Sequence, residues 1–121
     1  MSVRQRLPRK EDGHHLDFIR SLPCVCCGND IETQAAHLRT ENRFYGKDYT
    51  GGARKPSDMW TLPLCGRCHD AQHKGNEEAF WTARDINPWV LALSLFAASG
   101  DRELAFEVIE NQGRVAAPAR I

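Results

Sequence analysis

Apolar residues near the C-terminal end of the chain recur at the spacing of helices. An apolar run over residues 88–98 predicts one helix, with Asn87 as its N-cap and Pro88 at its first position. Asp101 predicts the start of a last helix, which we expect to end near Gly113. The packed side of this last helix is expected to hold Leu104, Ala105, Val108 and Ile109. These two helices should form a hairpin that packs on the rest of the chain.

The earlier residues alternate between short apolar runs and turn signals. The predicted elements are, in order, a helix over 14–21, strands over 31–38 and 59–62, a helix over 68–74 and a helix capped by Asn76. Pro63 should end the second strand or lie at an edge of the sheet. Residues 39–57, which contain several Gly and a Pro, are predicted to form a long loop between the strands. Short helices around two strands predict an α+β fold.

Five cysteines and five histidines stand out in the composition. Two C-x2-C pairs, Cys24 with Cys27 and Cys65 with Cys68, are typical of a tetrahedral site for one structural zinc ion. Ordinary buried thiols are the alternative. Cys26 is left out of the predicted site, because a small buried residue is the simpler interpretation.

The net charge of zero is a cancellation. Residues 1–75 carry 12 Lys and Arg against 9 Asp and Glu, whereas residues 76–121 carry 4 against 7. Basic residues gather in and beside the long loop, where Phe44, Tyr45 and Tyr49 also lie: Arg39, Arg43, Lys47, Arg54 and Lys55. Such a mixture suits a nucleic-acid backbone, although a solvated loop with ordinary surface charge remains open.

Three histidines are candidates for chemistry. His69 and His73 lie four positions apart, so on a helix they share one face and can bind one ion. Alternatively, His69 completes the zinc site in place of a cysteine. His37 ends the first predicted strand beside the basic loop, and its near-neutral pKa would let it accept a proton from water.

The order of these features resembles the HNH endonucleases, the ββα-metal (His-Me finger) nucleases of treble-clef type. The resemblance is carried by "PCVCCG", "AAHLR" and "KPSDMWTLPLCGRCHDAQH". It implies that His37 is the general base, that His69 and His73 hold a catalytic Mg²⁺ or Mn²⁺, and that the four cysteines hold zinc. The closest likeness is to phage-encoded proteins similar to the recombination-enhancement nuclease, and it extends over about residues 14–110 through a helical extension.

Two positions depart from that family. Trp60 stands nine residues before His69, where the family has Asn, and Asp58 is the nearest stand-in. As a carboxylate paired with the imidazole, Asp58 could orient His37; an exposed loop acid is the alternative. Ala36 stands where many members carry an extra metal ligand.

A length of 121 residues predicts one domain, which we divide into four segments. We expect a flexible basic arm over residues 1–13, a zinc-binding HNH module over 14–75, a helical extension over 76–113 and a frayed tail over 114–121. No apolar run approaches the roughly 20 residues that span a bilayer, and no apolar stretch follows the basic N-terminus. We therefore expect a cytoplasmic protein, in the cytoplasm of a bacterial host if it is phage-encoded.

The predicted function is a metal-dependent DNA endonuclease that leaves 5′-phosphate and 3′-hydroxyl ends. It would cleave duplex or single-stranded DNA with low sequence specificity. Arg67 and Lys74 would bind the DNA backbone together with the basic loop. A non-catalytic, zinc-dependent nucleic-acid-binding module is the alternative. A third interpretation is a zinc domain whose C-terminal hairpin, through Trp89, Leu93 and Phe96, binds an unidentified phage or host protein.

Overall fold

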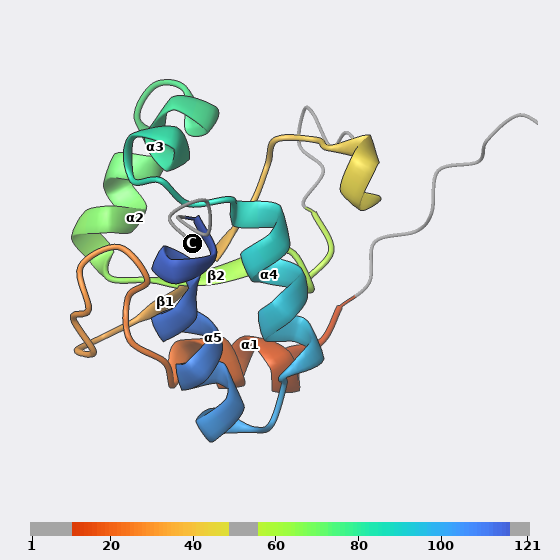
Figure 1. The fold of residues 1–121 in the computed structure, drawn as a ribbon, viewed down its shortest axis with the longest axis vertical. Coiled ribbons are helices and arrows are strands. Elements are labelled where there is room, and N and C mark those ends of the chain that lie inside the picture. Colours follow the sequence, from red (N-terminus) through yellow and green to blue (C-terminus); the bar gives the residue numbers. More distant parts are fainter. Residues whose placement is uncertain (1–10, 49–55, 117–121) are drawn as a thin grey trace, which may run out of the picture.

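The structure is a computed structural model that describes residues 11–48 and 56–116, with side chains through Gln112. Its elements are α1 (Gly13–Arg20), β1 (Gln34–His37), the 3₁₀ helix η1 (Arg43–Tyr45), β2 (Thr61–Leu64), α2 (Gly66–His73), α3 (Glu77–Ala83), α4 (Pro88–Ala97) and α5 (Arg102–Ala116) (Figure 1). The predicted α+β fold is confirmed. Within the described ranges, no helix is both long enough and apolar enough to cross a membrane.

The sheet is a single antiparallel pair, in which Gln34 faces Leu64 and His37 faces Thr61. Strand β1 is shorter than the predicted strand over 31–38, and β2 is displaced by two residues from the predicted strand over 59–62. Pro63 lies inside β2 and does not end it; the other predicted alternative, a position at an edge of the sheet, is confirmed. Each strand of a two-stranded sheet is an edge strand, so a proline costs no ladder bond on its outer side. The carbonyl of Pro63 accepts from Val25 N at 3.0 Å, which ties the first cysteine loop to the sheet.

Helices surround the strand pair. Helix α1 packs on both strands, α2 packs on both strands and on α3, and α4 packs on β2. Helix α5 lies alongside α4, which confirms the predicted hairpin (Figure 1). The centre of the core is fully buried and consists largely of Ile19, Leu22, Leu38, Leu62, Leu64, Trp81 and Leu95.

Side-chain caps fix where the helices begin. Asn76, Asn87 and Asp101 each accept a backbone N–H three residues on, as predicted. Asp12 caps α1 in the same way. Helix α5 runs past Gly113 to Ala116, because one interior glycine costs a helix only about 1 kcal/mol. Leu104, predicted on the packed side, is 44% exposed, whereas Ala105 is buried.

Candidate functional site

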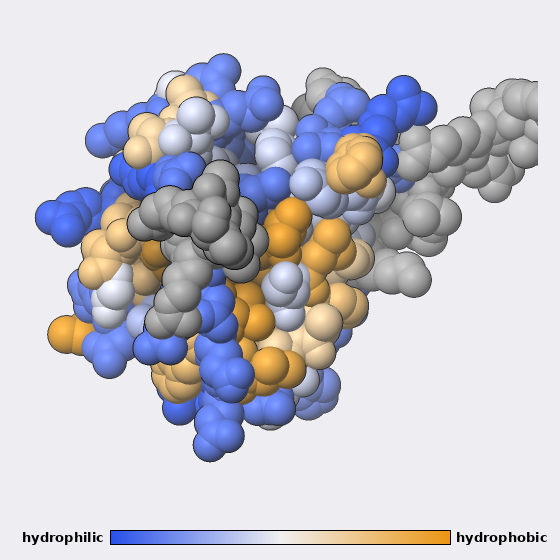
Figure 2. Space-filling model, viewed as in Figure 1, coloured by the Kyte–Doolittle hydropathy of each residue, from blue (hydrophilic) through white to orange (hydrophobic). Residues whose placement is uncertain are grey.

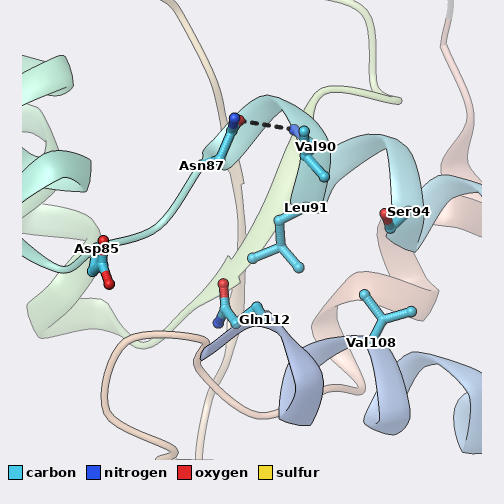
Figure 3. Close-up of a pocket in the computed structure, with 7 residues that line it drawn as sticks. All are labelled: Asp85, Asn87, Val90, Leu91, Ser94, Val108 and Gln112. Atoms are coloured by element: carbon cyan, nitrogen blue, oxygen red, sulfur yellow. Dashed lines mark hydrogen bonds between the residues drawn. The ribbon is translucent and has the colours of Figure 1, made fainter. Parts of the chain in front are cut away.

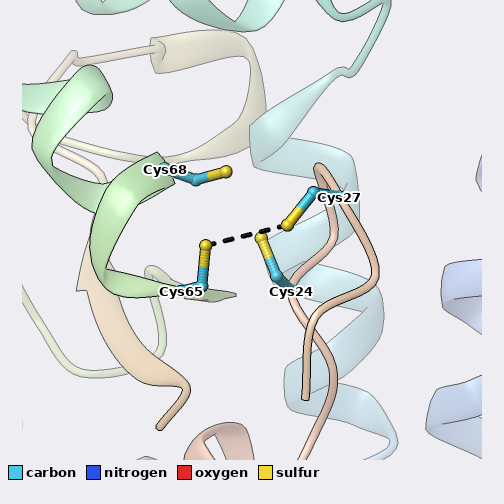
Figure 4. Close-up of side chains that lie close together, drawn as sticks. All are labelled: Cys24, Cys27, Cys65 and Cys68. Atoms are coloured by element: carbon cyan, nitrogen blue, oxygen red, sulfur yellow. Dashed lines mark hydrogen bonds between the residues drawn. The ribbon is translucent and has the colours of Figure 1, made fainter. Parts of the chain in front are cut away.

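The four predicted zinc ligands come together. Cys24 and Cys27 lie in the loop after α1, Cys65 precedes α2, and Cys68 lies in the first turn of α2 (Figure 4). Their Sγ atoms all lie within 4.8 Å of one another, and those of Cys27 and Cys65 are 3.7 Å apart. A tetrahedral zinc with bonds of about 2.3 Å places its sulfurs about 3.8 Å apart. The four cysteines therefore fit a zinc site.

Local backbone structure shapes both halves of this cluster. In the first half, Gly28 N donates to Cys24 O at 2.8 Å, and Gly28 has a φ of +80°, which favours glycine. In the second half, hydrogen bonds lower the pKa of the Cys65 thiol to about 7, and the largest effect is that of the backbone N–H of Cys68. Burial raises the pKa of Cys68. A divalent cation among the sulfurs favours the thiolate form at every ligand.

Cys26 lies outside the cluster, as predicted. Its side chain is half-buried, and burial raises the pKa of its thiol to about 12. Cys26 therefore stays protonated and packs as a small apolar residue.

The two helix histidines form a pair on α2. Their Nε2 atoms are 3.1 Å apart, and Gln34 Oε1 on β1 accepts from His69 Nδ1 at 2.6 Å. Because an amide oxygen carries no hydrogen, Nδ1 is the donor, and Nε2 of His69 keeps its lone pair. His69 thus points to His73 and Gln34, and it is not part of the sulfur cluster.

The separation of the two nitrogens suits a metal ion. Two ligands at about 2.1 Å and at right angles on an octahedral ion lie about 3.0 Å apart. The pKa of His69 is lowered, chiefly by burial and then by repulsion from His73, His37 and Arg39. A lowered pKa keeps the imidazole neutral, as a metal ligand must be. Within the described part of the chain, the cysteine cluster is the only group of three or more such ligand types, so this pair offers two protein ligands.

His37 is paired with the predicted stand-in, Asp58. His37 Nε2 lies 2.9 Å from Asp58 Oδ1, and the side chains are 22% and 3% exposed. The second oxygen of Asp58 accepts from Asp12 N at 2.7 Å. The alternative, an exposed loop acid, is wrong. Trp60, nine residues before His69, is a core residue whose carbonyl accepts from Leu38 N.

The family model described as "Protein of unknown function (DUF968)" matches residues 4–87. The chain belongs to this family. No curated protein matches it, and no solved structure matches it. The DUF968 match contains the four cysteines, the His37–Asp58 pair and the helix histidines, whereas α4 and α5 lie beyond its end.

The residues of this DUF968 protein that were predicted to bind the DNA backbone divide into three groups. Arg39, Arg43, Arg67 and Lys74 are exposed. Arg54 and Lys55 lie outside the described residues. Lys47 was predicted wrongly, because it is 1% exposed and its Nζ donates to Arg39 O and Asp48 O, both at 3.3 Å. Burial lowers its pKa, and its ammonium holds the loop together instead of facing a phosphate.

Glu77, which the sequence did not single out, anchors the segment after β1. Its Oε1 accepts from Arg39 N, Thr40 N and Thr40 Oγ1 at 2.8–3.0 Å. Its Oε2 accepts from Gln72 Nε2 at 2.6 Å, and Gln72 also donates to His37 O. One carboxylate on α3 thus joins the segment that begins at Arg39, called the basic segment below, to α2 and β1. Gln34 was missed for the same reason as Glu77, since each meets partners about 35 or more positions away.

Two of the three predicted interface residues on the C-terminal hairpin make contacts within the molecule. Trp89 Nε1 donates to Thr40 O at 3.1 Å, and Leu93 is half-buried. Phe96 is 36% exposed and meets the ring of His15 edge-on. Figure 2 shows apolar surface gathered over α4 and α5, where the exposed large apolar residues are Val90, Phe96, Leu104 and Phe106.

A small cavity of about 120 Å³ lies between α4 and α5 (Figure 3). Its lining consists of Asp85, Asn87, Val90, Leu91, Ser94, Val108 and Gln112. None of the predicted catalytic, metal or backbone-binding residues lines it. The candidate site residues lie instead in the part of the chain that carries the cysteine cluster.

Proposed function

We propose that this protein is a metal-dependent endonuclease that hydrolyses phosphodiester bonds in DNA. The observation that carries the proposal is the His37–Asp58 pair, with an N–O distance of 2.9 Å. A neutral imidazole that donates from Nε2 to the carboxylate has its lone pair on Nδ1. His37 can then take a proton from an attacking water, and Asp58 stabilises the imidazolium that forms.

The histidine pair on α2 would hold the cation. His69 and His73 present Nε2 atoms 3.1 Å apart, and Gln34 fixes the tautomer of His69. Bound there, Mg²⁺ or Mn²⁺ would supply positive charge for a phosphate oxygen and for the leaving 3′ oxygen. His37 lies near enough to act on the pKa of His69, so base and cation ligands belong to one region.

Exposed arginines and a lysine support a nucleic-acid substrate. Arg39 and Arg43 follow β1, and Arg67 and Lys74 lie at the two ends of α2. These residues flank the proposed cation site from both sides in the sequence. Contacts of this kind bind the phosphate backbone and give low sequence preference with strong salt dependence.

We propose further that zinc on the four cysteines holds a treble-clef, ββα-metal module. The cluster joins the loop after α1 to the N-terminus of α2. It therefore fixes α2, and with it His69 and His73, against the strand that carries His37.

The test is nicking of supercoiled plasmid with Mg²⁺ or Mn²⁺. His37→Ala should lower the rate by about 10²- to 10⁴-fold, the usual contribution of a general base. His14→Ala is the matched control, because His14 is an exposed histidine on α1. Both variants should keep their zinc and stay folded at the assay temperature. His37→Ala should unfold at a lower temperature than the parent, because buried Asp58 loses one of its partners. A His37→Ala protein that nicks at the parent rate contradicts the proposal.

A second candidate function is a non-catalytic, zinc-dependent nucleic-acid-binding module. The observation that favours it is the two-ligand cation site, with buried Ala36 where a further ligand would stand. This candidate predicts salt-dependent retention of DNA, no cleavage with either cation, and no effect of His37→Ala on binding.

A further inference from the structure

Phe44 lies on the η1 turn with its ring open to solvent. The residue is 86% exposed, the largest fraction among the large apolar side chains that the structure describes. The turn projects from the body of helices (yellow in Figure 1). Apolar rings are usually buried, so the open position of Phe44 needs a structural cause or a use.

The turn that carries Phe44 is firmly held. Asn42 Oδ1 accepts from Phe44 N at 3.1 Å, and the backbones of Asn42 and Lys47 exchange two hydrogen bonds of 3.0 Å. Gly46, with a φ of +83°, closes the turn. The bonds of Lys47 Nζ to Arg39 O and Asp48 O brace the segment from inside.

An aromatic ladder braces the turn from its other side. The Phe44 and Tyr45 rings meet edge-to-face at 4.9 Å, and Tyr45 lies parallel to Trp89 at 6.3 Å. Asn87 Nδ2 donates to Tyr45 OH at 3.1 Å. These contacts hold the Phe44 ring in its exposed position before any ligand binds. Binding of a ligand to the ring therefore costs little conformational entropy.

We propose that Phe44 is a stacking platform for an unpaired base, which makes single-stranded DNA, or duplex DNA with an unstacked base, the substrate class; this rests on the proposed nuclease function. The exposed Arg43 beside it supplies a cation for the adjoining phosphate. Every base has a π-face, so stacking on an aromatic ring beside a cation requires no particular base sequence.

The surroundings favour a base over a protein partner. The core of a protein interface is a contiguous apolar patch. Arg43, next to Phe44 in the sequence, and Glu41, three positions before it, are exposed charged residues, and Figure 2 shows mostly hydrophilic surface at this end of the molecule. One strongly exposed ring beside charged side chains matches the needs of a nucleobase better.

The experiment measures binding by fluorescence anisotropy with the full, zinc-loaded chain and no added Mg²⁺ or Mn²⁺. The probes are a labelled oligothymidylate and a strand of equal length built from abasic sugar-phosphate units. Phe44→Ala should weaken binding of oligothymidylate by about 5- to 100-fold, the usual effect of losing one stacked base. It should leave the abasic strand unchanged, and Phe44→Trp should retain the parent affinity. Phe106→Ala, which removes a 39% exposed ring on α5, is the control and should change neither affinity.

The outcomes separate this inference from the proposed function. If Phe44→Ala binds both strands like its parent, or loses affinity equally for both, the stacking platform is wrong while DNA binding stands. If the DNA affinity of Phe44→Ala equals that of the parent, a contact with a protein partner remains as the explanation for the exposed ring. If the parent protein binds neither strand at low salt, the stacking platform and the DNA substrate are both wrong.

Discussion

Asp58 Oδ1 lies 2.9 Å from His37 Nε2, although 21 positions separate the two residues. The carboxylate is buried, and its other oxygen accepts the backbone N–H of Asp12, the N-cap of α1. Both oxygens of Asp58 are thus engaged, which fixes the direction of the imidazole. Through its N-cap Asp12, helix α1 therefore also helps to position the candidate base.

Replacing Asp58 by Asn tests this arrangement. Asp58→Asn keeps the shape of the side chain but removes the charge that stabilises an imidazolium at His37. We expect the nicking rate to fall by roughly 10- to 1,000-fold, part of the usual contribution of a general base. Asp17→Asn, an exposed acid on α1, is the control and should keep the parent rate. Full activity of Asp58→Asn, with the variant folded, would contradict the role of the pair.

Gln34 is expected to set the affinity of the proposed cation site. Its Oε1 accepts from His69 Nδ1 at 2.6 Å and so directs the lone pair of Nε2 toward His73. Gln34→Leu should weaken Mn²⁺ binding by about 10- to 100-fold, as losses of such outer partners do. Gln34→Glu, which keeps an acceptor and adds charge, should retain or strengthen it. Electron paramagnetic resonance of Mn²⁺ measures both without cleavage, and equal affinity in Gln34→Leu would remove Gln34 from the site.

Zinc is expected to be required for folding. Zinc binding contributes about 10–16 kcal/mol to the folding of small zinc domains. This is as large as or larger than the usual free energy of unfolding of a domain, about 5–15 kcal/mol. Cys65→Ser should therefore lose zinc and its cooperative unfolding transition. Cys26→Ser should keep one zinc per chain, since Cys26 lies outside the cluster. Zinc content by elemental analysis and circular dichroism on heating measure the two effects; a folded, zinc-free Cys65→Ser would show that the cluster is dispensable.

Spacing along the chain predicted the features that depend on near neighbours. The caps at Asn76, Asn87 and Asp101 are local hydrogen bonds, and the two C-x2-C pairs each form one turn. The pairing of His37 with Asp58 was reached through a family resemblance rather than through spacing.

Features set by tertiary contacts could not be predicted in this way. A lysine in a basic loop is normally a surface residue, and Lys47 is buried because carbonyls of its own segment surround Nζ. Gln34 and Glu77 carry no motif; Gln34 meets His69 at 35 positions, and Glu77 meets Arg39 at 38 positions. Pro63 stays in β2 because no third strand among the described residues pairs with it.

Glu77 should determine how firmly the basic segment is held. Glu77→Ala removes the acceptor for three donors of Arg39 and Thr40. We expect a loss of about 1–3 kcal/mol in the free energy of unfolding, the cost of leaving such donors unpaired. Glu78→Ala changes an exposed neighbour on the same helix and should have little effect. Urea unfolding of the two variants measures the difference, and equal stability would show that water replaces the carboxylate.

His15 should make the protein less stable in mild acid. The residue is fully buried, and its Nδ1 lies 2.8 Å from Ser99 Oγ. Burial lowers the pKa of His15, against the smaller opposing effect of the Asp12 and Asp58 carboxylates. The folded protein therefore keeps His15 neutral at a pH where the unfolded chain, with a pKa of about 6.5, already binds a proton. Since the unfolded state binds more protons, stability from this group falls as the pH drops below about 6.5.

The variant His15→Phe removes this titration while it keeps a ring against Phe18 and Phe96. At pH 7.5 it should be less stable than the parent or equal to it, because the contact with Ser99 is lost. Between pH 7.5 and 5.5, its free energy of unfolding should fall less than that of the parent, by up to about 1.4 kcal/mol for each unit by which the pKa is lowered. His14→Phe, at an exposed position, should leave the pH dependence of the parent unchanged. Parallel pH profiles for His15→Phe and the parent would mean that His15 does not control the loss of stability in acid.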